Sequence, residues 1–420
     1  MTEIVAAPSV PHRGVFAGWY VVAAAFVMLM TSAGLGFYGL AVYLEAVTRE
    51  KGFATGPASL GSSLFFIVAG VVGRIIGPII GRRDVRVVVG VGAVVSGIAL
   101  ALLGHVNELW QFYGVYAVFA VGFACTAIVP GTTVVTRWFH KRRSVALSVA
   151  STGLSVGGLT LTKLAASLID SHGLSATTPW LGLAYVAIVV PVTALFMWPD
   201  PAARGMAPDG EPYVAPEGST AAVAAGVTYD DAVASRFFKL VTVGFVFVMG
   251  SQVGGITQMV KLGAERVDRS TGALAVSVLA LSSVVARLVG GLVASRVPMG
   301  VLTAALAAVQ GLSLVYLGFA DGKAALLGGA VLFGVTVGNL LMLQPLMLAE
   351  AFGVRDYPRV FSLNQLVVTV GIAGGPFLLG SLHDIASYRV AYTVAGVLSL
   401  AGAASVWSAG SVKKVQEELW

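Results

Sequence analysis

Two arginines in otherwise apolar stretches have the spacing expected of an anion-binding residue inside a membrane. Arg74 and Arg287 are each followed nine residues later by another arginine, Arg83 and Arg296, and each has a glycine three residues on. Nine residues of α-helix span about 14 Å, roughly half of a bilayer's hydrocarbon core. If the second arginine marks the membrane surface, the first lies near the midplane. A charge there is energetically costly unless it faces a water-filled cavity or pairs with another polar or charged group. A guanidinium stays protonated and offers a planar fork of donors that matches a carboxylate.

Arg287 is the leading candidate for contact with a substrate. A membrane arginine can instead pair with a neighbouring acid, but no Asp or Glu falls inside the predicted spans except near their ends. Arg74 either contacts the same anion from the opposite half of the chain, or bonds helix carbonyls and extends to the nearer surface. Lys163 either lines an outer vestibule that attracts anions, or extends to the outer surface near Asp170.

The composition is that of an integral membrane protein. Of the 420 residues, 57% are hydrophobic and 11% are charged, whereas soluble domains carry about 25% charged residues. The net charge of +6 does not indicate nucleic-acid binding, because the basic residues cluster in particular loops. Cys125 is the single cysteine, which excludes a disulfide framework within the chain. The sequence has no metal-ligand cluster and no acid–base pair within its spans, so we expect no metal, no cofactor and no enzymatic activity.

The apolar runs and helix breakers predict an all-α membrane protein with twelve transmembrane helices. The predicted spans are 16–44, 58–80, 85–103, 109–136, 144–169, 179–198, 237–260, 271–294, 300–319, 324–350, 360–382 and 388–409. A polar segment, 199–235, is expected to be a flexible cytoplasmic linker between two pseudo-symmetric six-helix halves, 1–198 and 236–420. Pro130 and Pro345 are expected to break the fourth and tenth helices at similar places.

The basic residues predict the orientation. Sixteen Lys and Arg fall in segments on the side of the N-terminus, seven fall in segments on the opposite side, and three lie within the spans. Cytoplasmic loops carry the excess of basic residues. We therefore expect both termini to be cytoplasmic, in a multi-pass protein of the plasma (inner) membrane.

Twelve helices in two repeated halves with a long inner linker resemble the major facilitator architecture. Trp138 to Gly153, WFHKRRSVALSVASTG, resembles the signature at the fifth helix of the monocarboxylate transporter family. Further resemblance comes from Gly18-Trp19, from Ala286-Arg287 with 291–294 (GLVA), and from Gly371 to Tyr388. The chain is also similar to the related bacterial oxalate–formate exchangers.

The resemblance implies roles for particular residues. In the family, the arginine at the position of Arg287 binds the substrate carboxylate. Proton-coupled members have an acidic residue one turn before it, where this chain has Ser283, and a lysine in the first helix, where this chain has Phe37. The usual proton relay is therefore incomplete. Coupling would instead run through Lys163 or through the substrate's own carboxyl group, or it would be absent. Tyr38 and Asn339 are our preferred additional site members among the polar side chains within the spans.

The loop after the second helix resembles a degenerate form of the facilitator loop motif. Gly81 fills its usual acidic position, and Asp84 comes late. In the superfamily this motif ties the second helix to the other half and gates the inner side.

These features together predict a secondary transporter that moves small organic anions by alternating access. We expect a monocarboxylate such as lactate or pyruvate, with proton coupling, in a protein that works as a monomer in a lipid bilayer without nucleic acid. One alternative is a dicarboxylate transporter or an anion exchanger of the oxalate–formate type, because two or three intramembrane cations exceed the need of one carboxylate. Another is a receptor that binds an anion without transporting it.

Overall fold

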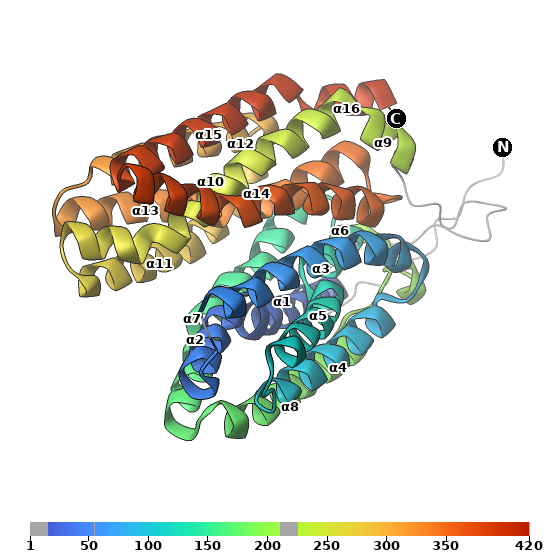
Figure 1. Ribbon diagram of the computed structural model, residues 1–420. Helices are drawn as coiled ribbons and strands as arrows, with labels where there is room; N and C mark the ends of the chain where they lie inside the picture. Colours follow the sequence, from blue (N-terminus) through green and yellow to red (C-terminus); the bar gives the residue numbers. More distant parts are fainter. Residues whose placement is uncertain (1–15, 54, 211–225, 420) are drawn as a thin grey trace, which may run out of the picture.

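The computed structural model describes residues 16–53, 55–210 and 226–419. This part of the chain contains twelve helical segments that are long and apolar enough to cross a membrane, as predicted. Apart from one isolated bridge between Gly226 and Gly353, it consists of helices, turns and loops. The helices form two bundles, one from each half of the chain (Figure 1).

The N-terminal bundle holds the first six spans, two of which are composite. They are α1 (Ala17–Thr31), the π-helical turn η1 (Ser32–Phe37) and α2 (Gly39–Lys51); α3 (Thr55–Arg82); α4 (Val85–Leu103); α5 (Leu109–Thr126) with α6 (Ile128–Trp138); α7 (Arg143–His172); and α8 (Leu174–Phe196). The first span runs seven residues beyond its predicted end at 44, because the polar residues that follow continue the helix. Arg49 stabilises this extension by pairing with Glu45, one turn away, and with Asp170 on α7.

The C-terminal bundle is preceded by short linker helices. These are η2 (Ala202–Arg204), η3 (Pro208–Gly210) and α9 (Tyr229–Ala234). Residues 211–225 of the expected linker lie outside the described residues. The second bundle contains α10 (Arg236–Arg266), α11 (Arg269–Ala294), α12 (Met299–Phe319), α13 (Lys323–Phe352), α14 (Tyr357–Ile385) and α15 (Tyr388–Ala409), followed by α16 (Val412–Leu419).

The two bundles repeat the same helix pairing. In the first, α1 packs on α7, α4 on α8 and α3 on α5; in the second, α10 packs on α14, α12 on α15 and α11 on α13. Glycines allow this close approach: a Cβ on Gly157 would lie 2.0 Å from the carbonyl oxygen of Met30, and one on Gly375 would lie 2.0 Å from that of Gly250. Small residues let helix backbones approach closely in lipid. The pairing supports the predicted duplication.

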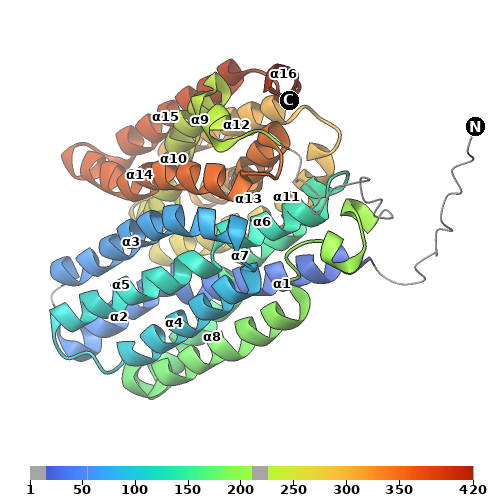
Figure 2. The same ribbon diagram turned by 90° about the vertical axis from the view of Figure 1, so that its right-hand side faces the viewer.

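The halves meet closely at one end of the molecule. We call this the terminal end, since α1 begins and α15 ends there (Figures 1 and 2). Arg143 Nη1 lies 2.9 Å from Glu350 Oε1, and Tyr357 donates a hydrogen bond of 3.2 Å to Thr132 Oγ1. Gly77 lies against α14, where a Cβ would be 2.5 Å from the carbonyl oxygen of Pro358. These contacts join α3, α6 and α7 of the first half to α13 and α14 of the second.

The two prolines behave differently. The fourth span breaks at Ala127, which has extended backbone angles of φ −87° and ψ −156°, three residues before Pro130. The break there was predicted. The predicted break at Pro345 is wrong, because α13 runs continuously from Lys323 to Phe352. Neighbouring helices can compensate for the hydrogen bond that a proline removes from a membrane helix.

Candidate functional site

Arg287 lies where three helices from both halves meet. It projects from α11 and is 0% exposed. Its Nε donates a hydrogen bond of 2.8 Å to the carbonyl oxygen of Gly338 on α13, and its Nη1 donates to the carbonyl oxygen of Ser151 on α7. In the described part of the chain, its Nη2 has no hydrogen-bond partner. The guanidinium is thus held by carbonyl oxygens of both halves and keeps unused donor capacity.

Small residues on the neighbouring helices create the space for this arginine. A Cβ on Gly338 would lie 2.2 Å from the carbonyl oxygen of Ser283, so α11 and α13 are in backbone contact there. On the α7 side, Ser148 Oγ donates a hydrogen bond to the carbonyl oxygen of Arg287. Gly291 lies beside the same serine, where a Cβ would be 2.5 Å from Ser148 Cβ. The long arginine side chain is buried because its neighbours are short.

The polar groups around Arg287 are hydroxyls. Ser283, one turn before it and 2% exposed, has its Oγ 3.5 Å from Ser155 Oγ on α7. Tyr38, directly after η1, is 37% exposed, and its ring lies against Gly158 of α7. In the described part of the chain no carboxylate forms an ion pair with Arg287. A buried cation without a carboxylate partner among the described residues is suited to holding an anion.

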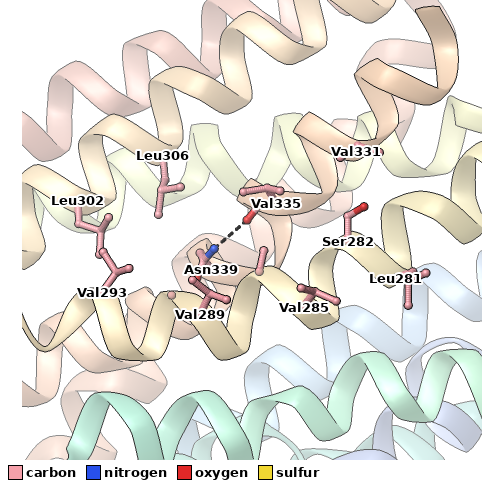
Figure 3. Close-up of a pocket in the computed structure, with 12 residues that line it drawn as sticks. Leu281, Ser282, Val285, Val289, Val293, Leu302, Leu306, Val331, Val335 and Asn339 are labelled. Atoms are coloured by element: carbon pink, nitrogen blue, oxygen red, sulfur yellow. Dashed lines mark hydrogen bonds between the residues drawn. The ribbon is translucent and has the colours of Figure 1, made fainter. Parts of the chain in front are cut away.

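Asn339 follows Gly338 in the sequence, but its side chain lines a groove between α11, α12 and α13. Its Nδ2 donates to the carbonyl oxygen of Val335 at 2.9 Å, and its Oδ1 has no hydrogen-bond partner. The side chain lies against Gly290, where a Cβ would be 1.5 Å from Oδ1. It forms the floor of an apolar groove of about 580 Å³ between α11, α12 and α13 (Figure 3).

Arg74 extends toward the terminal end. Its Nη2 donates a hydrogen bond of 2.8 Å to the Tyr229 hydroxyl of the linker helix α9, and its guanidinium carbon lies 5.3 Å from the centroid of the same ring. Arg359 of α14 also contacts this ring: its guanidinium carbon lies 4.4 Å from the ring centroid. The structure therefore gives Arg74 a partner at the terminal end and does not bring it together with Arg287.

Lys163 is exposed on α7. Thr160, Leu164 and Ser167 are also exposed, and their separation from Lys163 by one, three or four residues places all four on one face of the helix. In the part of the chain that the structure describes, its ammonium has no hydrogen bond or ion pair. The serines that face Arg287 lie on another side of the same helix, so Lys163 is not brought into this group.

The loop between α3 and α4 uses its late acidic residue locally. Asp84 Oδ1 accepts a hydrogen bond of 2.9 Å from the backbone N–H of Arg86 and thereby caps α4. Its Oδ2 accepts from Arg86 Nη2 at 2.7 Å. Hydrogen bonds from the Arg86 side chain hold the pKa of Asp84 below its usual value. Asp84 thus stabilises the first turn of α4 as its N-cap.

The serines of α7 are site residues that our sequence reasoning missed. Ser144, Ser148, Ser151 and Ser155 follow the spacing of one helix face, and this face packs on α11. That periodicity was visible in the sequence. The participation of the Gly338 carbonyl had no sequence signal, because any residue type supplies a carbonyl oxygen.

Comparisons with known proteins agree with this architecture. A family model described as Major Facilitator Superfamily matches residues 22–347 and 267–417. The chain is 26% identical over 422 residues to a Homo sapiens protein named Monocarboxylate transporter 11, covering 96% of this chain and 84% of that protein.

Two solved structures share the fold. The transporter FucP in the outward conformation superposes with a TM-score of 0.72 at 14% identity, covering 94% of this chain and 99% of FucP. The human organic anion transporter MFSD10 (TETRAN) superposes with a TM-score of 0.70 at 14% identity, covering 93% of this chain and 99% of MFSD10. Because the family model matches most of its length, the chain belongs to the major facilitator superfamily, as a multi-pass membrane transporter related to the monocarboxylate transporters.

Proposed function

We propose that this transporter moves small monocarboxylates such as lactate or pyruvate by alternating access, and that Arg287 binds the carboxylate. The observation that carries the proposal is the buried Arg287 guanidinium, which has an unused Nη2 and no carboxylate partner in the described residues. One turn before Arg287, the Ser283 hydroxyl lies 3.5 Å from the Ser155 hydroxyl of the first half. The name of the similar human protein supports a monocarboxylate as substrate.

Substrate binding is coupled to movement of the halves through the partners of Arg287. Its Nη1 donates to the Ser151 carbonyl of the first half, although Arg287 belongs to the second. A substrate carboxylate accepts charge-assisted hydrogen bonds that are roughly twice as strong as neutral ones. It therefore replaces the Ser151 carbonyl as the partner of Nη1 and engages the unpaired Nη2. The exchange removes one contact between the halves when the anion binds.

We further propose that the terminal end is cytoplasmic, which the excess of Lys and Arg on that side supports. The contacts between Arg143 and Glu350 and between Tyr357 and Thr132 hold this end closed. The state described here is then closed to the cytoplasm. An empty carrier carries buried, unneutralised charge through its transition, so bound anion should accelerate reorientation.

A substrate with one carboxylate is favoured over a dicarboxylate. The two further cations that suggested a diacid have other surroundings: Arg74 bonds Tyr229, and Lys163 lies on an exposed helix face. Proton coupling requires a carrier other than the family's acid and lysine. Ser283 has no titratable group in the relevant range, and Phe37 packs against Phe66 at 5.5 Å.

The test is uptake of radiolabelled lactate, pyruvate, acetate, oxalate and succinate into proteoliposomes, with and without an inward proton gradient. We expect lactate or pyruvate uptake that the gradient stimulates. Arg287→Ala should abolish this uptake. Lys163→Gln is the matched control, since it also removes a cation from a membrane span, and its uptake should be unchanged. Uptake that requires an anion preloaded inside, and is best for diacids, would favour the exchanger. Saturable lactate binding without uptake under any gradient would favour a receptor.

A further inference from the structure

A small cleft rich in arginine lies between the halves at the terminal end. Its volume is about 80 Å³. The end of α3 contributes Gly81 and Arg82, and the loop and first turn of α14 contribute Arg355, Asp356 and Arg359. The cleft is separate from Arg287. A ligand of this cleft would therefore be distinct from the anion that Arg287 binds.

The cleft has more positive charge than its own residues can neutralise. Three arginines line it together with one aspartate. Asp356 is already engaged, because its Oδ2 accepts from the backbone N–H of Tyr229 at 3.0 Å and its Oδ1 lies 3.8 Å from Arg359 Nη1. The side chains of Arg82 and Arg355 have no hydrogen bond or ion pair within the described residues, and Arg359 Nε is buried without a partner. Closing the terminal end thus brings the exposed Arg82 of one half toward Arg355 of the other, which is also exposed and lacks a carboxylate partner among the described residues.

We propose that this cleft binds a phosphate-type oxyanion, either the free ion or the headgroup of an anionic phospholipid, which bridges Arg82 to Arg355 and Arg359. Guanidinium groups bind tetrahedral oxyanions through paired, charge-assisted hydrogen bonds. The excess charge in the cleft matches a dianion, and the volume of about 80 Å³ admits a small ion but excludes a bulky one. The cleft also lies at the positive end of the 29-residue helix α14, which adds to the attraction.

The bridging geometry makes the oxyanion a conformational effector. Its ligands come from both halves, so the complete site exists only when the terminal end is closed. A ligand that binds one state better shifts the equilibrium toward that state. Bound oxyanion therefore stabilises the closed terminal end, and the closed state in turn binds the oxyanion more tightly.

The binding test uses the full chain in an uncharged detergent and inorganic phosphate as the probe. Thermal unfolding is followed against phosphate concentration, with sodium chloride keeping the ionic strength constant. We expect a saturable rise of the unfolding temperature. Arg82→Gln and Arg355→Gln should each raise the half-saturating concentration at least about tenfold, equivalent to about 1.4 kcal/mol. Arg296→Gln is the matched control, since this exposed arginine at the terminal end does not line the cleft.

A second arm identifies the source of the phosphate group. The protein is reconstituted in nanodiscs of phosphatidylcholine alone or with phosphatidylglycerol, and the same unfolding temperatures are measured. A rise with phosphatidylglycerol that Arg82→Gln and Arg355→Gln remove supports the headgroup, and a rise with inorganic phosphate supports the free ion. The proposal fails if neither probe gives a saturable shift, or if the shift is equal in wild type, both variants and Arg296→Gln.

The conformational part is tested by spin–spin distances between labels at Arg142 and Ser411, in a Cys125→Ser background. These exposed positions lie at the terminal end of opposite halves. The probe that binds should shift the distribution toward the shorter distance in wild type and leave it unchanged in Arg82→Gln. An unchanged distribution in wild type at saturating probe would contradict the effector role.

Discussion

The Arg143 guanidinium and the Glu350 carboxylate, 207 positions apart in sequence, form an ion pair of 2.9 Å that joins the two halves at the terminal end. Both side chains are largely buried, with 7% and 19% of their surface exposed. Arg143 also donates to the carbonyl oxygens of Phe139 and Ala349. The pair therefore links the start of α7 to the end of α13 where the halves are closed.

Replacing Glu350 by Gln should weaken this closure. Removing one partner of a buried pair costs about 3–5 kcal/mol, because the other charge remains buried and unpaired. We expect the first turn of α7 and the last turn of α13 to exchange backbone hydrogens faster, measured by hydrogen–deuterium exchange mass spectrometry. Asp84→Asn is the matched control, because its ion pair with Arg86 stays within one half. Equal exchange in wild type and Glu350→Gln would contradict the role assigned to this pair.

Gly338→Ala should damage both packing and transport. The added Cβ would lie 2.2 Å from the Ser283 carbonyl oxygen, so α11 and α13 must separate and the acceptor of Arg287 Nε must move. Overpacking of this kind costs about 1–3 kcal/mol. Uptake and the unfolding temperature should both fall. Gly328→Ala, on the same helix with open space around its Cα, should leave both unchanged. A wild-type unfolding temperature for Gly338→Ala would show that the close approach is not needed.

Tyr229→Phe and Arg74→Gln should have non-additive effects on stability. Each removes the same hydrogen bond of 2.8 Å, worth about 0.5–1.5 kcal/mol or more with a charged donor. Once one partner is replaced, replacing the other should cost little, as measured by thermal unfolding of the double variant. The KM for lactate should be unchanged in Arg74→Gln. A raised KM with unaltered stability would instead make Arg74 a substrate contact.

Ser283→Asp should make transport more strongly dependent on pH than it is in the wild type. An aspartate one turn before Arg287 would compete with the substrate carboxylate for the guanidinium when ionised and would release it when protonated. We therefore expect weak lactate uptake at pH 8 and stronger uptake as the pH falls. Ser283→Asn has the same size without a titratable group. If its pH profile matched that of Ser283→Asp, ionisation at this position would not be the cause.

The sequence was sufficient to predict the twelve spans, their division into two halves and the apolar setting of Arg287, because hydropathy and repeated spacing encode these features directly. The partner of Arg74 could not be predicted, since Tyr229 is 155 positions away at the end of a linker. The orientation of Asn339 toward a groove depends on how α11, α12 and α13 pack around it. Periodicity identifies the faces of a helix but does not say which neighbour each face meets.

The π-helical turn η1 changes the direction in which the side chains after it point. The backbone N–H of Tyr38 bonds to the carbonyl oxygen of Ala33, five residues back, so this turn contains one residue more than an α-helical turn. Residues after it are rotated by about 100° from where a regular helix counted from Trp19 would put them. Counting along a regular α-helix from Trp19 therefore does not give the direction of the Tyr38 side chain, the first after this turn. One extra residue in the turn is enough to change which side chain faces the neighbouring helix, here the Tyr38 ring against Gly158 of α7.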